Sequence, residues 1–244
     1  MSRFQASSIH LGISLAVFAA IAYAVLAIWY PSFLFQTDGG SQGLRILLGV
    51  DLVMGPLLTL IVYRAGKPGL RFDLTTIGVL QAGCLAAGIW IVHSERPLAI
   101  VYVDGSFYSV SAQSFIEAGV LIPNLESLPG DYPKWVSVDL PKDYEEQSKL
   151  RGAMLGRNRM LATLADRYVP FDPSQIDNKE ARSPDEIIDQ DRDAAASPAW
   201  LEEHGGGLTD YRYYPYGARY AFAYLGFDAK DGRFVGYLKT PAPR

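Results

Sequence analysis

Three long apolar runs fill the first 95 residues of the chain. They cover residues 9–30, 44–63 and 74–92, and each has a Trp or Tyr at or near its end. An α-helix rises 1.5 Å per residue, so about 20 apolar residues cross the roughly 30 Å of hydrocarbon in a bilayer. Amphipathic rings prefer the headgroup layer at either surface. The pattern therefore predicts a membrane protein with three transmembrane helices in residues 1–95.

The two short connectors between these runs differ in charge. Residues 31–43 contain no Lys or Arg, whereas residues 64–71 (RAGKPGLR) contain three cationic side chains, and Arg3 and His10 lie near the start of the chain. Cationic connectors stay in the cytoplasm under the positive-inside rule. The N-terminus is thus expected in the cytoplasm, and residues 96–244 outside it. In a bacterium this describes a multi-pass inner-membrane protein with a periplasmic domain.

The first apolar run allows two other interpretations. A signal peptidase could cut at the triplet Ala22-Tyr23-Ala24, but the apolar run continues for six more residues without a polar stretch. A pilin-like leader would need a carboxylate a few residues into the helix, and Gly12 is followed by ISLAVFAA. A retained helix is the favoured interpretation, and cleavage would leave the topology of the remainder unchanged.

The exported part, residues 96–244, is expected to form one domain held by packing alone. The single cysteine, Cys84, lies in the third apolar run, so an intrachain disulfide is impossible. From Glu95 onward there are 17 Lys and Arg against 23 Asp and Glu, a net charge of −6, which argues against a nucleic-acid partner.

Alternating apolar positions and turn residues predict an α+β fold for this domain. Its first half contains a hairpin at residues 98–103 and 106–110 around Asp104-Gly105, a helix from Ser111, a strand at 134–140 and a helical stretch at 141–166 with Gly156 as a break. Its second half contains a capping box at 183–186, a glycine run at 205–207 and a closing hairpin at 218–227 and 234–239 around the turn 228–233.

The most informative intramembrane feature is the sequence Gly49-Val-Asp51-Leu-Val-Met-Gly55-Pro56. An ionised Asp in hydrocarbon costs about 2.5 to 3.5 kcal/mol on insertion scales, so it normally faces a protein interior or a partner. Glycine permits close approach of helices, and proline frees a backbone carbonyl. Asp51 is therefore the best candidate for a functional site, with Gly49, Gly55 and Pro56 around it.

Two interpretations of Asp51 are open. It can hydrogen-bond inside the bundle, to Gln81 or Thr76 of the third helix, and hold the helices together. Alternatively it faces outward and contacts a client protein, with Arg45 as a second candidate nearer the surface.

The sequence gives little support for a catalytic or a metal site. Asp51 and Asp73 would differ in depth by roughly 18 Å or more, too far apart to share a scissile bond. Asp73 is better explained as a carboxylate at a helix N-terminus near Lys67 and Arg71. Hydrolase and phosphate-loop motifs are absent, and His10, His93 and His204 are isolated from one another in the sequence. No enzyme activity and no cofactor are predicted.

The exported domain has one further candidate surface in its tyrosine-rich segment, residues 211–224. Tyr213, Tyr216 and Tyr220 could contact a partner, because Tyr offers apolar area at little entropic cost. The favoured alternative is that these rings cover the domain's own sheet.

The membrane portion resembles the type IV pilin accessory protein family, the TfpX/TfpZ group. The resemblance is carried, in order, by HLGISL (10–15), WYP (29–31), GG (39–40), GVDLVMGPLLTL (49–60), KPGLRFDL (67–74), LQ (80–81) and RP (96–97). GVDLVMGPLLTL is the specific element. The exported domain is similar more loosely, chiefly in the DAKDG turn of its closing hairpin.

This resemblance implies a non-enzymatic inner-membrane chaperone for a cognate major pilin, working with the pilus assembly machinery. A membrane-resident pilin has an apolar helix and a periplasmic head, and three helices plus a domain on the same side suit both parts. A scaffold or sensor subunit of another envelope complex would have the same topology and remains the alternative. A membrane enzyme is a third, less favoured class.

Overall fold

The computed structural model describes residues 2–176, 181, 182, 187 and 210–240. The chain divides into two compact units: a helical unit of Met1–Phe35 and Gly39–Arg96, and a sheet unit of Gln36–Asp38 and Pro97–Arg244. The predicted capping box at 183–186 and glycine run at 205–207 lie outside the described residues.

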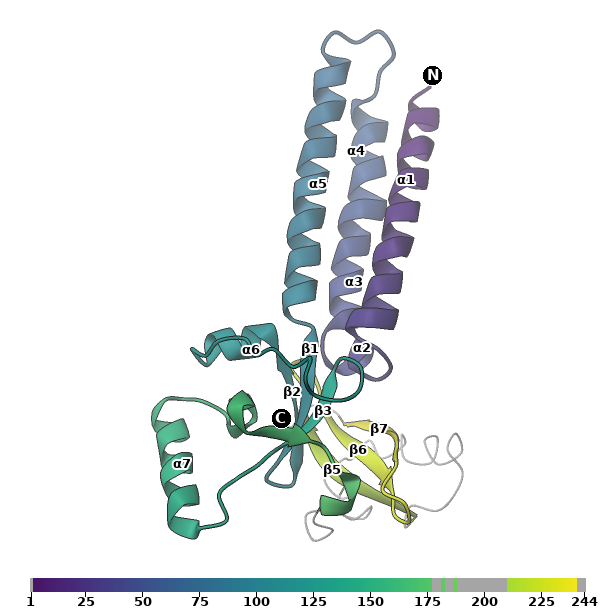
Figure 1. Ribbon diagram of the computed structural model, residues 1–244. Coiled ribbons are helices and arrows are strands. Elements are labelled where there is room, and N and C mark those ends of the chain that lie inside the picture. Colours follow the sequence, from purple (N-terminus) through teal and green to yellow (C-terminus); the bar gives the residue numbers. More distant parts are fainter. Residues whose placement is uncertain (1, 177–180, 183–186, 188–209, 241–244) are drawn as a thin grey trace. The chain divides into compact units, whose positions relative to one another are not determined.

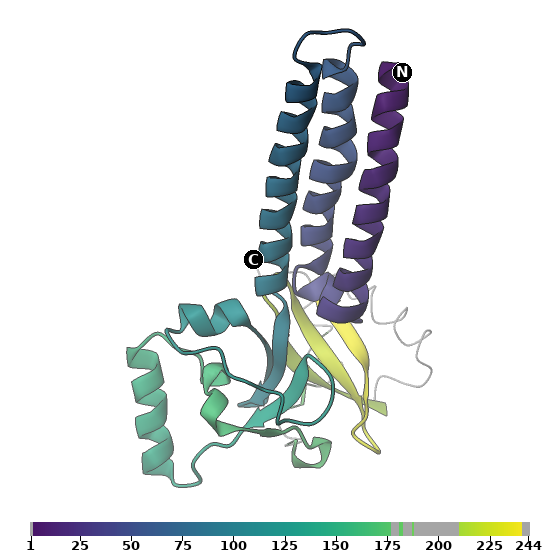
Figure 2. The ribbon, with the colours of Figure 1, turned by 45° about the horizontal axis from the view of Figure 1, so that its top comes forward.

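The helical unit consists of three long helical rods, seen side by side in Figures 1 and 2. The first joins α1 (Arg3–Tyr23) to a π-helical turn (Ala24–Trp29), and the third is α5 (Leu70–Ser94). The second joins α3 (Gly40–Leu48), a π-helical turn (Gly49–Met54) and α4 (Gly55–Val62). With 27, 23 and 25 residues, all three are long and apolar enough to cross a membrane, which confirms the prediction.

The helix ends show why the rods begin earlier than the apolar runs predict. Ser2 caps α1 in a reciprocal capping box with Gln5, so the helix includes polar residues before the apolar run. Gly69 adopts a left-handed conformation ahead of α5. Near that start, Lys67 pairs with Asp73 at 2.6 Å, in agreement with the expected role of Asp73 at a helix N-terminus.

The sheet unit is built on a mixed sheet of seven strands among the described residues, in the order β4-β3-β1-β2-β5-β6-β7. The strands are β1 (Pro97–Val103), β2 (Ser106–Ser111), β3 (Lys134–Val138), β4 (Tyr168–Pro170), β5 (Tyr211–Gly217), β6 (Phe222–Asp228) and β7 (Phe234–Thr240). The pairs β1–β3 and β2–β5 are parallel and the others antiparallel. With α6 (Ala112–Glu117) and α7 (Tyr144–Gly156), the fold is α+β, as predicted.

Local signals placed most of these elements correctly. Asp104 and Gly105 adopt positive φ angles of 51° and 71° in the β1–β2 turn, and the Ser111 side chain caps α6. The helix predicted to reach residue 166 instead ends at Gly156. Asn158 then takes a positive φ of 53°, and 3₁₀ turns follow at Leu161–Thr163 and Ala165–Arg167. The closing hairpin is confirmed as β6 and β7.

The strands β4 and β5 were not predicted. Proline is unusual inside a sheet because it has no N–H, and Pro215 lies in the middle of β5. The sheet accepts it because β2 pairs with β5 only at Tyr216 and Gly217, so the edge of β5 before these residues lacks a partner in β2.

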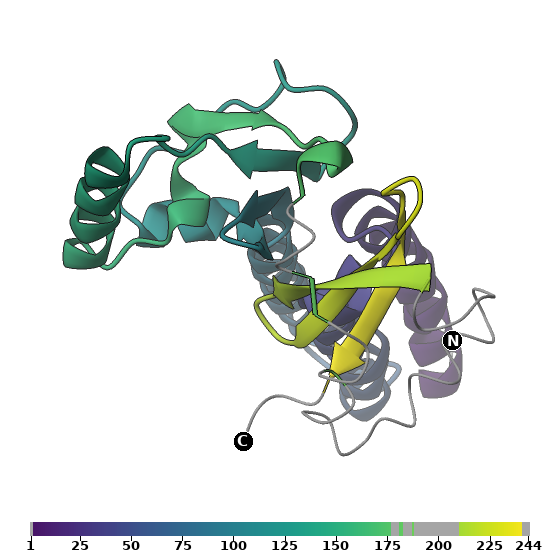
Figure 3. The same ribbon diagram turned by 90° about the horizontal axis from the view of Figure 1, so that it is seen from below.

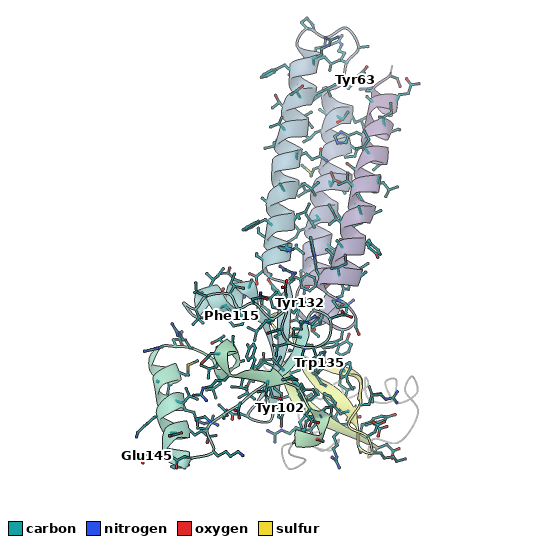
Figure 4. The ribbon with its side chains drawn as sticks, viewed as in Figure 1. Tyr63, Tyr102, Phe115, Tyr132, Trp135 and Glu145 are labelled. Atoms are coloured by element: carbon teal, nitrogen blue, oxygen red, sulfur yellow. The ribbon has the colours of Figure 1, made fainter. Side chains whose placement is uncertain are left out.

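The two faces of the sheet have different chemistry. Side chains alternate along each strand, so Val101 and Val136 lie on the face covered by Phe115 of α6, and Tyr102 and Trp135 on the other. On this second face aromatic rings contact one another; Phe107 stacks on Phe227 with centroids 5.3 Å apart. Figure 3 shows α6 and α7 beside the strands of the β1–β4 half, and Figure 4 labels Tyr102, Phe115 and Trp135.

Candidate functional site

Asp51 lies where the second rod departs from regular α-helix. Pro56 has no N–H to donate, and the preceding segment, Gly49–Met54, forms a π-helical turn. The Asp51 carbonyl oxygen accepts a hydrogen bond from Nε2 of Gln81 at 3.3 Å. A side-chain amide of α5 thus satisfies a backbone carbonyl in the irregular segment, a substitution that non-regular backbone needs inside a membrane.

The Asp51 carboxylate is the centre of a polar cluster that joins all three rods. Its Oδ1 accepts hydrogen bonds from Nε2 of Gln81 at 2.6 Å and from Oγ of Ser14 at 3.1 Å. Asp51 is 4% exposed and Ser14 is 2% exposed. Of the two expected partners Gln81 is therefore the one found, whereas the Thr76 hydroxyl donates to the Phe72 carbonyl in its own helix.

The burial of Asp51 settles which way it faces in the helical unit. The interpretation in which Asp51 points outward toward a client is wrong, because its side chain lies among the three rods. Oδ2 of Asp51 and Oε1 of Gln81 are also buried, and within the described part of the chain neither has a hydrogen-bond partner. The cluster thus has two buried acceptors beyond the bonds it makes.

Two further polar contacts continue this cluster along α1. Nδ1 of His10 and Oγ1 of Thr59 lie 2.6 Å apart, and Oγ of Ser7 donates to the Pro56 carbonyl at 2.9 Å. Ser7, His10 and Ser14 are spaced by three and four residues, so they share one face of α1. The three residues were not predicted as a group, although their helical spacing could have revealed them. The predicted Pro56 position thus supplies an acceptor to a neighbouring helix.

The glycines of this region differ in what surrounds them. A Cβ on Gly55 would lie 2.5 Å from Oε1 of Gln81, so only glycine leaves room for that amide. A Cβ on Gly49 would have no atom within 4 Å, so the expected close approach of a helix at Gly49 is not found. Arg45 lies outside the cluster: it is exposed, and its side chain forms no hydrogen bond or ion pair with any described residue.

A second buried polar group lies in the sheet unit, at Asp38. Its Oδ2 accepts hydrogen bonds from the Thr37 hydroxyl at 2.6 Å and from the Tyr216 hydroxyl at 2.8 Å, and the backbone N–H of Tyr220 donates to the Thr37 carbonyl at 3.2 Å. Asp38 and Tyr216 are 178 residues apart in the sequence. Asp38 was not predicted as a site residue, because no local sequence signal distinguishes it.

Burial sets the proton affinity of this second group. Loss of solvent raises the pKa of Asp38, and hydrogen bonds from Ser109, Thr37, Tyr216 and the backbone at Arg219 oppose the change. Burial likewise raises the pKa of Tyr216 well above its usual range, aided by the neighbouring Asp38 charge. The arrangement favours a neutral phenol that donates to Asp38.

The predicted tyrosine surface is corrected in part. Tyr213 and Tyr216 are fully buried in β5, so neither contributes to an exposed surface, and burial raises the pKa of Tyr213 to about 12. Tyr220 is 53% exposed. The favoured alternative, that these rings cover the domain's own sheet, therefore describes the first two, and only Tyr220 remains available to a partner.

Neither cluster has the composition of a metal site. Across residues 2–176, 181, 182, 187 and 210–240, no group of three or more His, Cys, Asp or Glu side chains converges. What the geometry supplies is internal polar bonding between helices in one unit and between a connector and a strand in the other.

Comparisons with known proteins give the family. Residues 1–32 match the family model described as fimbrial assembly protein FimB. Three fimbrial assembly proteins of Dichelobacter nodosus each align over 99 residues, 39% of this chain. The serogroup I protein is 34% identical to this chain and the serogroup E1 protein 33%, and in both the alignment covers 38% of the relative. The protein of serogroups C1 and C2 is 33% identical, and the alignment covers 75% of it.

The match to the serogroup I and E1 proteins thus spans well under half of their length. No solved structure matches the chain. The serogroup C1 and C2 relative, by contrast, is covered over three quarters of its length. The chain therefore belongs to the fimbrial assembly protein family.

Proposed function

We propose that this protein is an accessory protein of type IV pilus assembly, of the TfpX/TfpZ group, which acts as a dedicated membrane chaperone for one major pilin. The observation that carries the proposal is its membership of the fimbrial assembly protein family. The three apolar rods support it, because residence in the same membrane brings a chaperone into reach of a membrane-held subunit. The role requires no catalysis and no cofactor, and nucleic acid is not a partner.

The proposed topology follows the charges of the connectors. Residues 1–95 form the membrane domain in the bacterial inner membrane, with the N-terminus and the Lys67–Asp73 region in the cytoplasm. Residues 96–244 form the periplasmic domain. A pilin held in the same bilayer with its head in the periplasm then meets helices and a soluble domain of the chaperone on matching sides.

The polar cluster supports a division of labour within the membrane domain. Because Asp51 is buried and bonded to Ser14 and Gln81, we assign it to holding the three rods in a fixed arrangement. Contact with the pilin helix then falls to outward-facing residues of the second rod. Val53 and Ile61 are 52% and 71% exposed, and Arg45 is the exposed cation of the same rod. Arg45 is the candidate for an ion pair with the client.

The test combines deletion with crosslinking in cells. Loss of the gene should reduce the amount of the cognate pilin and abolish pili, and the wild-type gene should restore both. A photo-crosslinking residue at position 53 or 61 should capture the pilin, and one at buried Thr59 should capture it far less.

Three outcomes separate the possibilities. A pilin adduct at the exposed positions supports the chaperone. Capture of other envelope proteins alone, with pilin present in the membrane, favours the scaffold or sensor. Normal piliation and pilin levels after deletion would refute a role in pilus assembly.

A further inference from the structure

One end of the sheet is tied to the membrane by the covalent chain itself. The membrane-spanning helix α5 ends at Ser94, and β1 begins at Pro97. Three residues reach at most about 10 Å. The first residues of β1 therefore lie within about 10 Å of the end of a membrane helix, whatever the angle between the two units.

The register of the sheet extends this constraint to three further segments. Pro97 pairs with Ser111, so α6, which starts at the next residue, begins at this same end. Ala99 pairs with Lys134 in parallel, so the loop that enters β3 also arrives here.

The third segment is the connection between β5 and β6. Strand β5 runs parallel to β2 and finishes at Gly217, toward the same end. The backbone N–H of Tyr220 then binds the Thr37 carbonyl, and Thr37 is only three residues from the start of α3 at Gly40. A second covalent connection thus places this loop close to a membrane helix.

α6, the chain that follows it and the β5–β6 connection up to the first residue of β6 carry a concentration of exposed apolar side chains, which we call the apolar rim. It consists of Ile116, Leu121, Ile122, Tyr132, Tyr220 and Phe222. In the described part of the sheet unit, ten large apolar side chains are exposed, and these are six of them. Leu121 is 94% exposed. Such exposure is unfavourable in water and indicates a covering partner.

Two of the three segments that carry the rim are joined by an ion pair within the sheet unit. Nη2 of Arg219 lies 3.5 Å from Oε1 of Glu117, which ties the β5–β6 connection to α6. Figure 4 shows Phe115 and Tyr132 at one end of this unit and Glu145 of α7 at the other. Arg151 of α7 binds Asp104 in the β1–β2 turn. At 3.3 Å per residue, this turn lies roughly 20 Å from Pro97 along β1, so α7 contacts the opposite end of that strand.

We propose that the apolar rim inserts into the headgroup layer of the bilayer that holds the three helices. Leu and Ile side chains enter the acyl boundary, and Tyr prefers the headgroup level. The bilayer is the occupant that the connectivity favours, because the rim lies on the segments that the chain brings to the membrane. Docking in this way restrains the sheet domain against the membrane surface. The inference is independent of the proposed function.

The experiment measures where single labels sit relative to lipid. Full-length protein carrying Cys84→Ala receives one new cysteine, by Leu121→Cys, Tyr220→Cys or, as the matched control, Leu155→Cys. Leu155 is 82% exposed and lies on α7. Each variant is labelled with the fluorophore NBD and reconstituted in nanodiscs of phosphatidylethanolamine and phosphatidylglycerol. Emission maximum, quenching by lipids with a shallow doxyl group and quenching by aqueous iodide are recorded.

The rim labels should emit at shorter wavelength than the label at position 155, with stronger doxyl quenching and weaker iodide quenching. Equal emission and equal iodide access at all three positions would overturn the proposal. Shielding of positions 121 and 220 that appears only when a pilin is co-reconstituted would overturn it too, and would assign the rim to a protein partner. Because all three positions are exposed, the label itself has room, and circular dichroism checks folding.

Discussion

Replacing Gln81 by Leu should weaken the helical unit by about 1 to 2 kcal/mol. Nε2 of Gln81 makes two hydrogen bonds to Asp51, one to Oδ1 at 2.6 Å and one to the backbone carbonyl at 3.3 Å. Leucine removes both, together with a long contact at 3.5 Å from Nε2 to Oγ of Ser14, and leaves Asp51 with Ser14 alone. Leucine is similar in size, so the change tests the hydrogen bonds more than the packing.

The magnitude follows from the two lost bonds. Hydrogen bonds between membrane helices average about 0.6 kcal/mol and reach about 1.7 kcal/mol. Two bonds therefore give about 1 to 2 kcal/mol, with the shorter bond to the carboxylate at the upper end. Loss of the buried Oε1, which has no hydrogen-bond partner among the described residues, offsets part of this cost.

The assay is SDS-induced unfolding of the purified protein in mixed micelles, followed by circular dichroism at the helical band, to which the three rods contribute most. Thr75→Leu is the matched control, since Thr75 is an exposed polar residue of the same helix and should change stability by less than about 0.5 kcal/mol. A double-mutant cycle with Asp51→Leu should return a coupling energy of about 1 kcal/mol. If Gln81→Leu behaves like Thr75→Leu, or the cycle shows no coupling, the cluster does not hold the helices together.

Three further predictions concern the sheet unit. Tyr216→Phe removes the hydroxyl that donates to Asp38 and should destabilise the unit by about 1 to 2 kcal/mol, measured by hydrogen exchange of the β5 and β6 amides; Tyr220→Phe, at an exposed ring, should leave exchange unchanged. Asp38→Asn should remove a pH dependence: the folded pKa is raised above 3.8, so its stabilising contribution is complete below that pH and is lost as pH rises through the folded pKa. Equal pH profiles for wild type and variant would contradict this. Asp104→Ala breaks a bidentate pair with the roughly 40% exposed Arg151 and should cost no more than about 1 kcal/mol in thermal stability, with a clearly larger loss counting against the estimate.

The local sequence determined the elements whose signals lie within a few residues. Apolar length fixed the three membrane rods, because each one needs only its own side chains to be stable in hydrocarbon. Asp104 and Gly105 fixed the first hairpin through their positive φ angles, and Ser111 fixed the start of α6 through a side-chain cap. The motif around Asp51 also identified the polar centre of the bundle before its partners were known.

Only the tertiary structure decided how these parts combine. Gln81 and Thr76 are both polar residues of α5, and the rotation of that helix against the second rod selects Gln81. Asp38 meets Tyr216 across 178 residues of sequence, a pairing that only the folded sheet creates. The same sheet buries Tyr213 and Tyr216 in strand β5, which the sequence does not predict because Pro215 lies within it. In each case the deciding contact is a long-range one, and its geometry depends on helix rotation or strand pairing that no local pattern specifies.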